Sequence, residues 1–592
     1  MHRPRACTRP HHRLGLFARR LLLLVVAMTP WLAVGAQQVH QAPPSLLAQF
    51  DLDLGTLQSL SLPGTQHDAV TTTVALGGVR YTVDLALHDV RSPDFQLYER
   101  TALGLVPLPR PACVTYRGQL RERPDARVAA TVVDGSMEAM IHMPAEDPAA
   151  PGEVWVVQPV RRAQPGARAS LHVVYRAADS AALPGECGTD TTGAPTTAPP
   201  GSTDFTAVCE IALEADLQFY QWNNSSVTQT QNDVTSVMNQ VDFIFDRDVD
   251  VTYSVVALIV TTSTVYTTND ASALLSQFSS YWNSNNGSIQ RDVAHLFTGR
   301  NLSGSTIGIA YLSVICSQGN GYGLSQSDFT NNFNRRVGLT CHELGHNFSA
   351  PHCNGNNPCY IMCSGLGGCS NNVTLFGPSA AAQIDGYAHN SPCMPPPTTV
   401  PALTSITPSS LTVFSPGGVT LQGTGLLTMD RFTVGGQTFT AGYAVQSDTQ
   451  VAVMVPQGQA LGPTSVTVGN VLGTSNPMTF SYTLTQPPKL RSTALIPPTG
   501  GVASYDFGGV PGNQWFLLLG VTPVTTPLLG LDVLSNPVVL AAGSHPAPLG
   551  ISNVSVPVPP GLGVLQFFLQ VVEGDPAGVA AGATNVTTTI LQ

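Results

Sequence analysis

One stretch decides the fold: His342-Glu343-Leu344-Gly345-His346-Asn347-Phe348-Ser349-Ala350-Pro351-His352. Four residues of α-helix turn the chain by about 400°, so His342 and His346 lie on one face of a helix, one turn apart. Two imidazole nitrogens at that spacing can bind one Zn²⁺ at about 2.0–2.1 Å. His352 supplies a third nitrogen if the helix ends near Phe348 and the chain turns back. Three protein ligands leave one position open, which is typical of a catalytic zinc site.

Glu343 follows the first histidine and lies about 100° further round the helix. From there its carboxylate can reach a water at the metal without being a ligand, so we expect Glu343 to act as general base. The alternative is a helix that carries solvated histidines. The third histidine at a suitable offset argues against that alternative.

The next segment carries a methionine in the sequence Cys359-Tyr360-Ile361-Met362. Together with the histidine stretch, this wording resembles the metzincin zinc proteases, and in particular their reprolysin (adamalysin, ADAM-type) branch. The resemblance implies a turn that places Met362 beneath the metal, where it packs and takes no chemical role. The sequence departs from the family at Ser349, where reprolysins have glycine, and at Cys353, where they usually have aspartate. A left-handed backbone at Ser349 would cost roughly 1–2 kcal/mol.

At 592 residues the chain is too long for one hydrophobic core. The resemblance implies a multidomain fold: an α/β metzincin catalytic domain, with a mixed sheet and an active-site helix, preceded by a β-rich propeptide and followed by two β-sandwich domains. The first of these sandwiches resembles an IPT/TIG module, which has an immunoglobulin-like fold. The predicted boundaries are 1–36 for a signal peptide, 37–203 for the propeptide and linker, 204–396 for the catalytic domain, 401–485 for the IPT/TIG domain and 487–592 for the second sandwich.

Within the catalytic domain, alternating and helical hydrophobic spacings predict a strand, a helix, a strand and a helix before the histidine helix. A later segment, 308–314, is predicted as the strand above the cleft. If its edge is unpaired, an extended peptide can bind there as an added strand. The alternative is an ordinary buried strand. The four elements are predicted at Val208–Leu213, Thr228–Phe245, Val249–Val260 and Ala271–Trp282.

Composition limits the classes of partner. Only 11% of the residues are charged, the formal net charge is −11, and the chain has 55 Gly and 47 Pro. A negative chain of this kind is not expected to bind nucleic acid. The charge-poor C-terminal domains suit contact with an extracellular surface or matrix component.

The N-terminus has the features of a secretory signal peptide. Arg13, Arg19 and Arg20 precede the apolar run 21–36, and Val34-Gly35-Ala36 is a suitable cleavage site. The alternative is a membrane anchor, but Pro30 interrupts the run and the run is short for a stable membrane span. We therefore expect a secreted or extracellular protein, which could also be associated with the cell surface.

Cysteines are numerous and clustered. Of the 11 cysteines, Cys7 falls in the signal segment and eight lie between Cys209 and Cys393. In an exported chain such a set predicts disulfides, whose connectivity the sequence does not determine. The family resemblance implies that Cys316 pairs with Cys393.

A further cysteine lies near the end of the propeptide. The segment Pro184-Gly185-Glu186-Cys187-Gly188 resembles the switch by which metzincin propeptides block the metal, because a thiolate could fill the open zinc position. The alternative is a disulfide between Cys187 and Cys113. The resemblance also implies a Ca²⁺ held by Glu210 and Asp292, whereas the simpler interpretation is that both are solvated surface charges.

These features predict a secreted zinc metalloendopeptidase that is made as a zymogen and hydrolyses protein or peptide substrates. Two alternatives remain at this point. One is an inactive, protease-like adhesin built on β-sandwich modules, for which Glu343 would have no use. The other is a zinc hydrolase that acts on a non-peptide substrate.

Overall fold

A computed structural model of the chain describes residues 39–67, 69–145, 152–192, 197, 205–353, 360–365, 374–412, 417–440, 442–456, 458, 462–483 and strand segments between 490 and 591. The predicted signal peptide, and most of the linker predicted at 188–203, lie outside these residues. None of the helices in the described ranges is long and apolar enough to cross a membrane.

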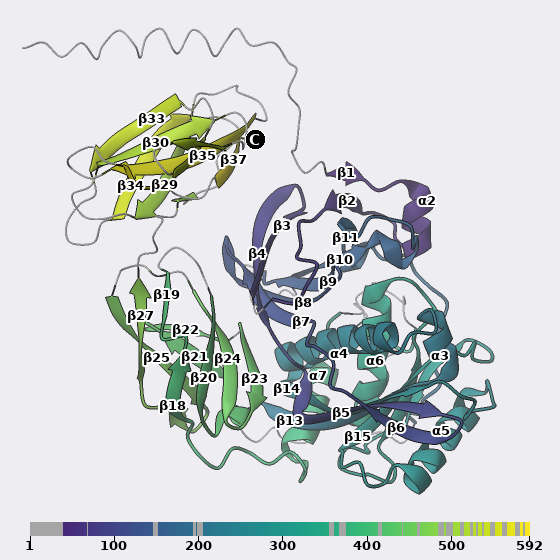
Figure 1. Cartoon of the computed structure of the whole chain (residues 1–592). Helices are drawn as coiled ribbons and strands as arrows, with labels where there is room; N and C mark the ends of the chain where they lie inside the picture. Colours follow the sequence, from purple (N-terminus) through teal and green to yellow (C-terminus); the bar gives the residue numbers. More distant parts are fainter. Residues whose placement is uncertain are drawn as a thin grey trace, which may run out of the picture. The chain divides into compact units, whose positions relative to one another are not determined.

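The segment that precedes the linker is built mainly of one antiparallel sheet (Figure 1). The strand order is β1-β2-β11-β10-β9-β8-β7-β4-β3. Its inward-facing side chains, such as Val83, Val128 and Ile141, are fully buried in a core of their own. The strands are β1 His40–Gln41, β2 Thr56–Ser59, β3 Ala69–Leu76, β4 Val79–Leu87, β7 Thr115–Leu120, β8 Arg123–Val133, β9 Ser136–Met143, β10 Glu153–Pro159 and β11 Leu171–Arg176, with the short helix α2 at Pro44–Leu47.

The histidine stretch belongs to a second, mostly parallel sheet and its helices. The sheet order is β12-β16-β17-β15-β13-β14-β5-β6, and the β16–β17 and β5–β6 pairs are antiparallel. The predicted strands at 208–213 and 249–260 are confirmed as β13 and β14. The strands are β5 Arg91–Thr101, β6 Gly104–Leu108, β12 Glu186–Cys187, β13 Ala207–Ala215, β14 Val251–Thr261, β15 Val293–Thr298, β16 Thr306–Ala310 and β17 Tyr322–Gln326.

Helices cover both faces of this sheet. On one face α4 packs on β14 and on α6, and α6 in turn packs on β16 and β17, while α5 covers the other face through Phe278 and Trp282 (Figure 1). The predicted helices at 228–245 and 271–282 are confirmed as α4 and α5. The helices are α3 Leu217–Trp222, α4 Val227–Val249, α5 Ala271–Asn285, α6 Phe333–Asn347 and α7 Pro378–His389.

Both edges of this sheet are formed by segments from the region predicted as the propeptide. At one edge β5 pairs in parallel with β14, and at the other β12 pairs in parallel with β16. The strand predicted at 308–314 is therefore β16, ends at Ala310, and does not present a free edge. Its outer side is occupied by Glu186–Cys187 of the same chain. The sequence could not predict this, because the pairing joins segments more than a hundred residues apart.

Two β-rich regions follow the catalytic domain. In the first, the sheets β18-β20-β24-β23 and β19-β27-β25-β21-β22 enclose a core that includes Val419, Val453 and Phe480, and β26 pairs with β25. The strands are β18 Ala402–Thr407, β19 Ser410–Thr412, β20 Gly417–Thr424, β21 Arg431–Val434, β22 Gln437–Phe439, β23 Tyr443–Ser447, β24 Gln450–Val455, β25 Gly462–Asn470, β26 Gly473–Thr474 and β27 Met478–Thr483.

The second β-rich region has the sheets β28-β29-β34, β33-β30-β35-β36 and β31-β32, and β37 also pairs with β35. The strands are β28 Leu490–Ser492, β29 Gly501–Gly508, β30 Gln514–Gly520, β31 Thr525–Leu528, β32 Leu531–Leu534, β33 Val538–Ser544, β34 Ile551–Val558, β35 Leu565–Gly574, β36 Ala580–Ala583 and β37 Thr587–Leu591.

Candidate metal centre

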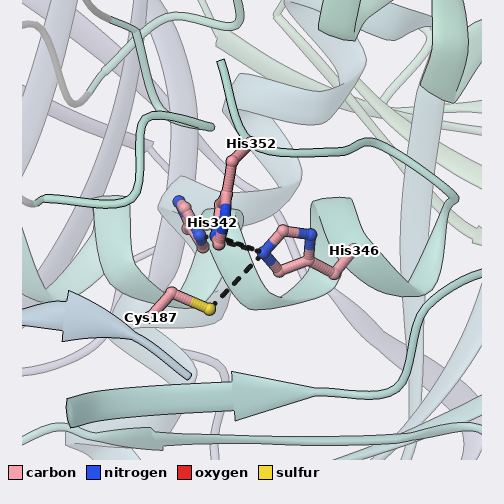
Figure 2. A group of neighbouring side chains, drawn as sticks. All are labelled: Cys187, His342, His346 and His352. Atoms are coloured by element: carbon pink, nitrogen blue, oxygen red, sulfur yellow. Dashed lines mark hydrogen bonds between the residues drawn. The ribbon is translucent and has the colours of Figure 1, made fainter. Parts of the chain in front are cut away.

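Three histidine rings converge at the C-terminal end of α6. Nε2 of His346 lies 3.0 Å from Nε2 of His342 and 3.2 Å from Nε2 of His352 (Figure 2). The helix ends at Asn347, with Phe348 as its C-cap, and the chain then turns so that His352 returns toward the helix. The expected termination near Phe348 is therefore confirmed, and the predicted residues lie together.

Backbone carbonyls hold two of these rings. Nδ1 of His342 lies 2.6 Å from the carbonyl oxygen of Ile361, and Nδ1 of His346 lies 2.7 Å from that of Ala350. A carbonyl can only accept, so each Nδ1 carries the proton and each Nε2 presents a lone pair. Burial and the neighbouring His352 lower the pKa of His342 to about 3. Both rings are therefore neutral at physiological pH, which is the form that binds a metal.

Met362 lies beneath the histidines and is fully buried. A Cβ built on Gly345 would lie 2.5 Å from the Met362 sulfur, so this methionine packs directly on the helix backbone between His342 and His346. A residue larger than glycine cannot stand at position 345 without moving Met362. The sequence prediction of a methionine under the site agrees with this packing.

Glu343 is fully buried beside the histidines. Its Oε2 accepts a hydrogen bond from the Cys187 thiol at 3.4 Å, and its Oε1 lies against Gly308 of β16. Burial raises the pKa of Glu343 to about 8. Opening the site to water would favour the ionised carboxylate, which can accept a proton.

Cys187 reaches the histidines from the region predicted as the propeptide. Its Sγ lies 3.4 Å from Nε2 of His346, and the four ligand atoms of Cys187, His342, His346 and His352 all lie within 4.8 Å of one another (Figure 2). The backbone of the switch segment is held on both sides, because Cys187 N–H donates to the Ser364 carbonyl at 3.0 Å and Gly188 N–H donates to the Gly308 carbonyl at 2.9 Å.

Thr189 is a contact that sequence reasoning missed. Its hydroxyl donates to the Ala310 carbonyl at 3.1 Å and accepts from the Ala310 N–H at 2.9 Å. It thus completes the pairing of the switch segment with the end of β16. No sequence signal distinguishes this threonine from its neighbours in a Thr-rich stretch.

This donor set fits a zinc ion. Tetrahedral coordination with Zn–N of about 2.0–2.1 Å and Zn–S of about 2.3 Å would separate the nitrogens by roughly 3.4 Å and nitrogen from sulfur by roughly 3.5 Å. The observed separations of 3.0, 3.2 and 3.4 Å are close to those values. Imidazole and thiolate are also ligands that Zn²⁺ prefers.

Among the described residues of the predicted catalytic domain, four cysteines form two disulfides, and Cys359 and Cys369 lie outside those residues. Cys316 pairs with Cys393, which confirms the pairing implied by the family resemblance, and Cys353 pairs with Cys363. Cys209 and Cys341 carry free thiols that are fully buried, so the expectation that the whole cluster is oxidised was wrong for them. They pack as small apolar side chains.

Cys113 and Cys187 also carry free thiols. Cys113 is buried in the propeptide, where its Sγ lies 3.4 Å from the carbonyl oxygen of His88. The proposed disulfide between these two cysteines is therefore absent from the structure.

The residues suggested for calcium do not form a metal site in the structure. Asp292 is nearly buried, and its Oδ2 accepts a hydrogen bond from the Glu210 N–H at 2.8 Å, while the Glu210 side chain is exposed. The structure therefore gives no support for calcium here.

Comparisons with known proteins agree with this geometry. Residues 206–381 match the model of a reprolysin family, described as metallo-peptidase family M12. The chain carries a reprolysin-like metallopeptidase domain. Residues 401–482 match the model of the IPT/TIG domain, so the metallopeptidase domain is followed by an IPT/TIG module. The M12 match favours a zinc metallopeptidase over an inactive adhesin.

Individual relatives are distant. Disintegrin and metalloproteinase domain-containing protein 19 of Mus musculus is 27% identical over 236 residues, which cover 36% of this reprolysin-like chain and 24% of that protein. The chain thus spans about a quarter of that relative's length. The crystal structure of metalloproteinase-II from Bacteroides fragilis aligns with a TM-score of 0.31 at 14% identity, over 53% of this chain and 89% of that one.

Proposed function

We propose that this chain is the latent form of a secreted zinc metalloendopeptidase. His342, His346 and His352 would hold the Zn²⁺, and Cys187 would fill the fourth position. The observation that carries the proposal is the convergence of these four ligand atoms within 4.8 Å of one another. A thiol and three neutral imidazoles, brought together from two parts of the chain, have no comparable use without a metal.

Each residue of the centre then has a defined task. When bound, Zn²⁺ supplies a Lewis acid that polarises a peptide carbonyl and acidifies water. Glu343 takes a proton from the attacking water and passes it to the leaving amine. In the latent form its Oε2 faces the Cys187 thiol instead. Departure of Cys187 therefore opens the fourth metal position and the general base in one step.

The substrate class follows from the strand that holds the switch. Strand β16 pairs with Glu186–Cys187 along its outer side, so the same side would accept the backbone of another extended peptide once the propeptide has left. Pairing of this kind reads the main chain and sets little demand on the substrate sequence. A peptide bond is accordingly the expected target.

Export of the protein is part of the same proposal. The two disulfides of the catalytic domain, Cys316–Cys393 and Cys353–Cys363, form and persist in oxidising compartments. The IPT/TIG domain and the β-rich region after it would then meet extracellular surfaces or matrix. This part is tested by a pull-down of matrix components with the full chain and with a chain that lacks residues 401–592. Only the full chain should bind them.

The metal ligands and the general base are tested by three single variants. Glu343→Ala should retain zinc and lose peptidase activity by at least about 10²–10⁴-fold, because only the proton transfer is removed. His352→Ala should lower zinc affinity sharply. His389→Ala is the control, since His389 is the last residue of α7 and bonds the Phe205 carbonyl. Equal zinc loss in both histidine variants, or an active Glu343→Ala enzyme, would contradict the assignment.

Latency is tested with the two propeptide cysteines. Cys187→Ala should give a full-length chain that cleaves casein without removal of the propeptide, whereas Cys113→Ala should stay latent. Chelator should abolish the activity of the first variant, and Zn²⁺ should restore it. A latent Cys187→Ala chain that still contains zinc would contradict the switch but not the metal site.

A further inference from the structure

The three histidines of the metal centre are not held in the same way. His342 and His346 are each fixed through Nδ1 by a backbone carbonyl. For His352, no hydrogen bond to Nδ1 is found within the described part of the chain, and this ring is only partly buried. It also lies beyond the end of α6, on a loop. The third ligand therefore needs another means of support.

The support lies one residue further along the chain. Cys353 is joined by a disulfide to Cys363, ten residues later, and its backbone N–H donates to the Met362 carbonyl at 2.9 Å. Two connections thus tie the residue after His352 to the turn that carries Met362. Because Cys353 is adjacent to His352, they limit where the imidazole can lie.

The same turn, residues 361–364, holds the other ligands. The Ile361 carbonyl accepts from His342, Met362 packs on Gly345 of α6, and the Ser364 carbonyl accepts from the Cys187 N–H. Cys363 adds the covalent connection to the loop of His352. One short segment therefore sets the relative positions of ligands that come from the helix, from the loop after it and from the propeptide.

We infer that the Cys353–Cys363 disulfide is the positioning element for the third zinc ligand, His352, and that it makes zinc affinity depend on oxidation. The disulfide fixes the position of His352, as a hydrogen bond to Nδ1 fixes each of the other two histidines. A chain with both thiols reduced would fold around α6 but bind Zn²⁺ weakly. The metal centre would then become competent only in an oxidising compartment. This inference rests on the proposed zinc site.

The test compares two disulfides in one background. The full-length chain carrying Cys187→Ala is the parent, so that a fourth protein ligand does not mask the loss of the third. In this parent we make Cys353→Ala with Cys363→Ala, and separately Cys316→Ala with Cys393→Ala. Both cysteines are removed each time, because a thiol left alone could itself bind metal. The readouts are zinc affinity by chelator competition, the d–d absorption of the Co²⁺ form, and the melting temperature.

The two double variants should differ in zinc affinity and in melting temperature. Loss of Cys353–Cys363 should weaken Zn²⁺ binding by about 10–100-fold, as loss of ligand-orienting contacts generally does, and should reduce the four-coordinate Co²⁺ absorption. Loss of Cys316–Cys393 should leave zinc affinity unchanged but lower the melting temperature of the apo chain more, because it closes a loop of 77 residues rather than 10.

Two results would overturn the inference. One is a Cys353/Cys363 variant that binds Zn²⁺ as tightly as the parent. The other is an equal loss of affinity in both variants, which would reflect general destabilisation. A parent that binds no zinc would instead overturn the proposed function itself, and with it the basis of this inference.

Discussion

Ser349 stands where the family resemblance predicts glycine, and its environment explains why a serine is found there. Its φ is +75°, so the left-handed backbone expected at this position is present. Its hydroxyl accepts hydrogen bonds from Ser313 Oγ at 2.8 Å and from Gln383 Nε2 at 3.2 Å. The side chain thus joins the end of the zinc helix to the 313 loop and to α7.

These bonds change the expected effect of restoring glycine. Ser349→Gly relieves a strain of roughly 1–2 kcal/mol, but it loses two hydrogen bonds of about 0.5–1.5 kcal/mol each and loosens the unfolded chain by about 0.5–1 kcal/mol. We expect a net destabilisation of about 1 kcal/mol in urea unfolding. Ser349→Ala keeps the strain and loses the bonds, so it should be less stable than Ser349→Gly. A glycine variant more stable than the parent would show that strain outweighs the bonds.

At this scale the sequence predicted the residues whose chemistry depends on local spacing. His342, Glu343 and His346 share one helix, so their relation follows from helical geometry. For Cys187 the sequence left two alternatives open, a switch at the zinc position or a disulfide with Cys113, and it could not join Cys353 to Cys363, because both relations depend on tertiary structure. Eight cysteines allow 105 pairings, and spacing does not choose among them.

Strand β16 is shaped around Glu343, the proposed general base. A Cβ built on Gly308 would lie 2.3 Å from Glu343 Oε1 and 2.8 Å from Leu339 Cδ1. Glycine at this position is therefore required for Glu343 to lie flat against the strand. The strand thus has two structural features, since its backbone pairs with Glu186–Cys187 and the missing side chain of Gly308 leaves room for Glu343.

Gly308→Ala should consequently displace Glu343 without touching a metal ligand. We expect zinc content to be unchanged and kcat to fall by about 10²-fold, the cost of misplacing a catalytic group by about 1 Å. Gly319→Ala is the matched control, because a Cβ there meets nothing within 4 Å. Peptidase assays on the propeptide-free enzymes, normalised to zinc, would check this. Equal activities of the two variants would rule out the steric argument.

For helix α4 the sequence predicted the helix and its buried apolar stripe but not the burial of its polar residues. The apolar stripe predicted from the sequence is buried, as expected, yet the helix also buries Asp233 and Asp242 on other faces. Polar residues at these positions predict a solvated face. They are buried because the propeptide sheet packs on α4 and supplies their partners, which no local pattern in the helix can indicate.

At the scale of the whole molecule, the region predicted as the propeptide is held by charge as well as by strands. Arg117 donates to Asp242 at 2.5 Å, Arg162 donates to Asp233 at 2.8 Å, and Arg127 pairs with Asp246. All three carboxylates lie on α4, and all three arginines belong to the propeptide. Although burial alone would raise it, Arg162 and Arg336 hold the pKa of Asp233 at about 2. With β12 at one edge of the sheet and β5 and β6 at the other, this region therefore has contacts far from the linker.

After cleavage of the linker alone, the propeptide should accordingly stay bound. The arginine–aspartate pairs should then set the rate at which it dissociates. Removing one partner of a buried, hydrogen-bonded charge pair generally costs 2–5 kcal/mol. Arg117→Ala should therefore speed dissociation of the cleaved propeptide at least tenfold and raise peptidase activity after cleavage. Arg162→Ala should act less strongly, because Asp233 keeps its bidentate pair with Arg336 of α6.

Arg123→Ala provides the control for this series, since Arg123 pairs with Asp125 within the propeptide and both side chains are well exposed. Dissociation is followed by gel filtration of the cleaved chain, and activity is followed on casein in the same samples. If the same fraction of cleaved propeptide elutes with the catalytic domain in Arg117→Ala as in Arg123→Ala, then the strands β5 and β12 hold the complex without the charge pairs. The order expected from the buried contacts is Arg117→Ala first, Arg162→Ala second, and Arg123→Ala indistinguishable from the parent.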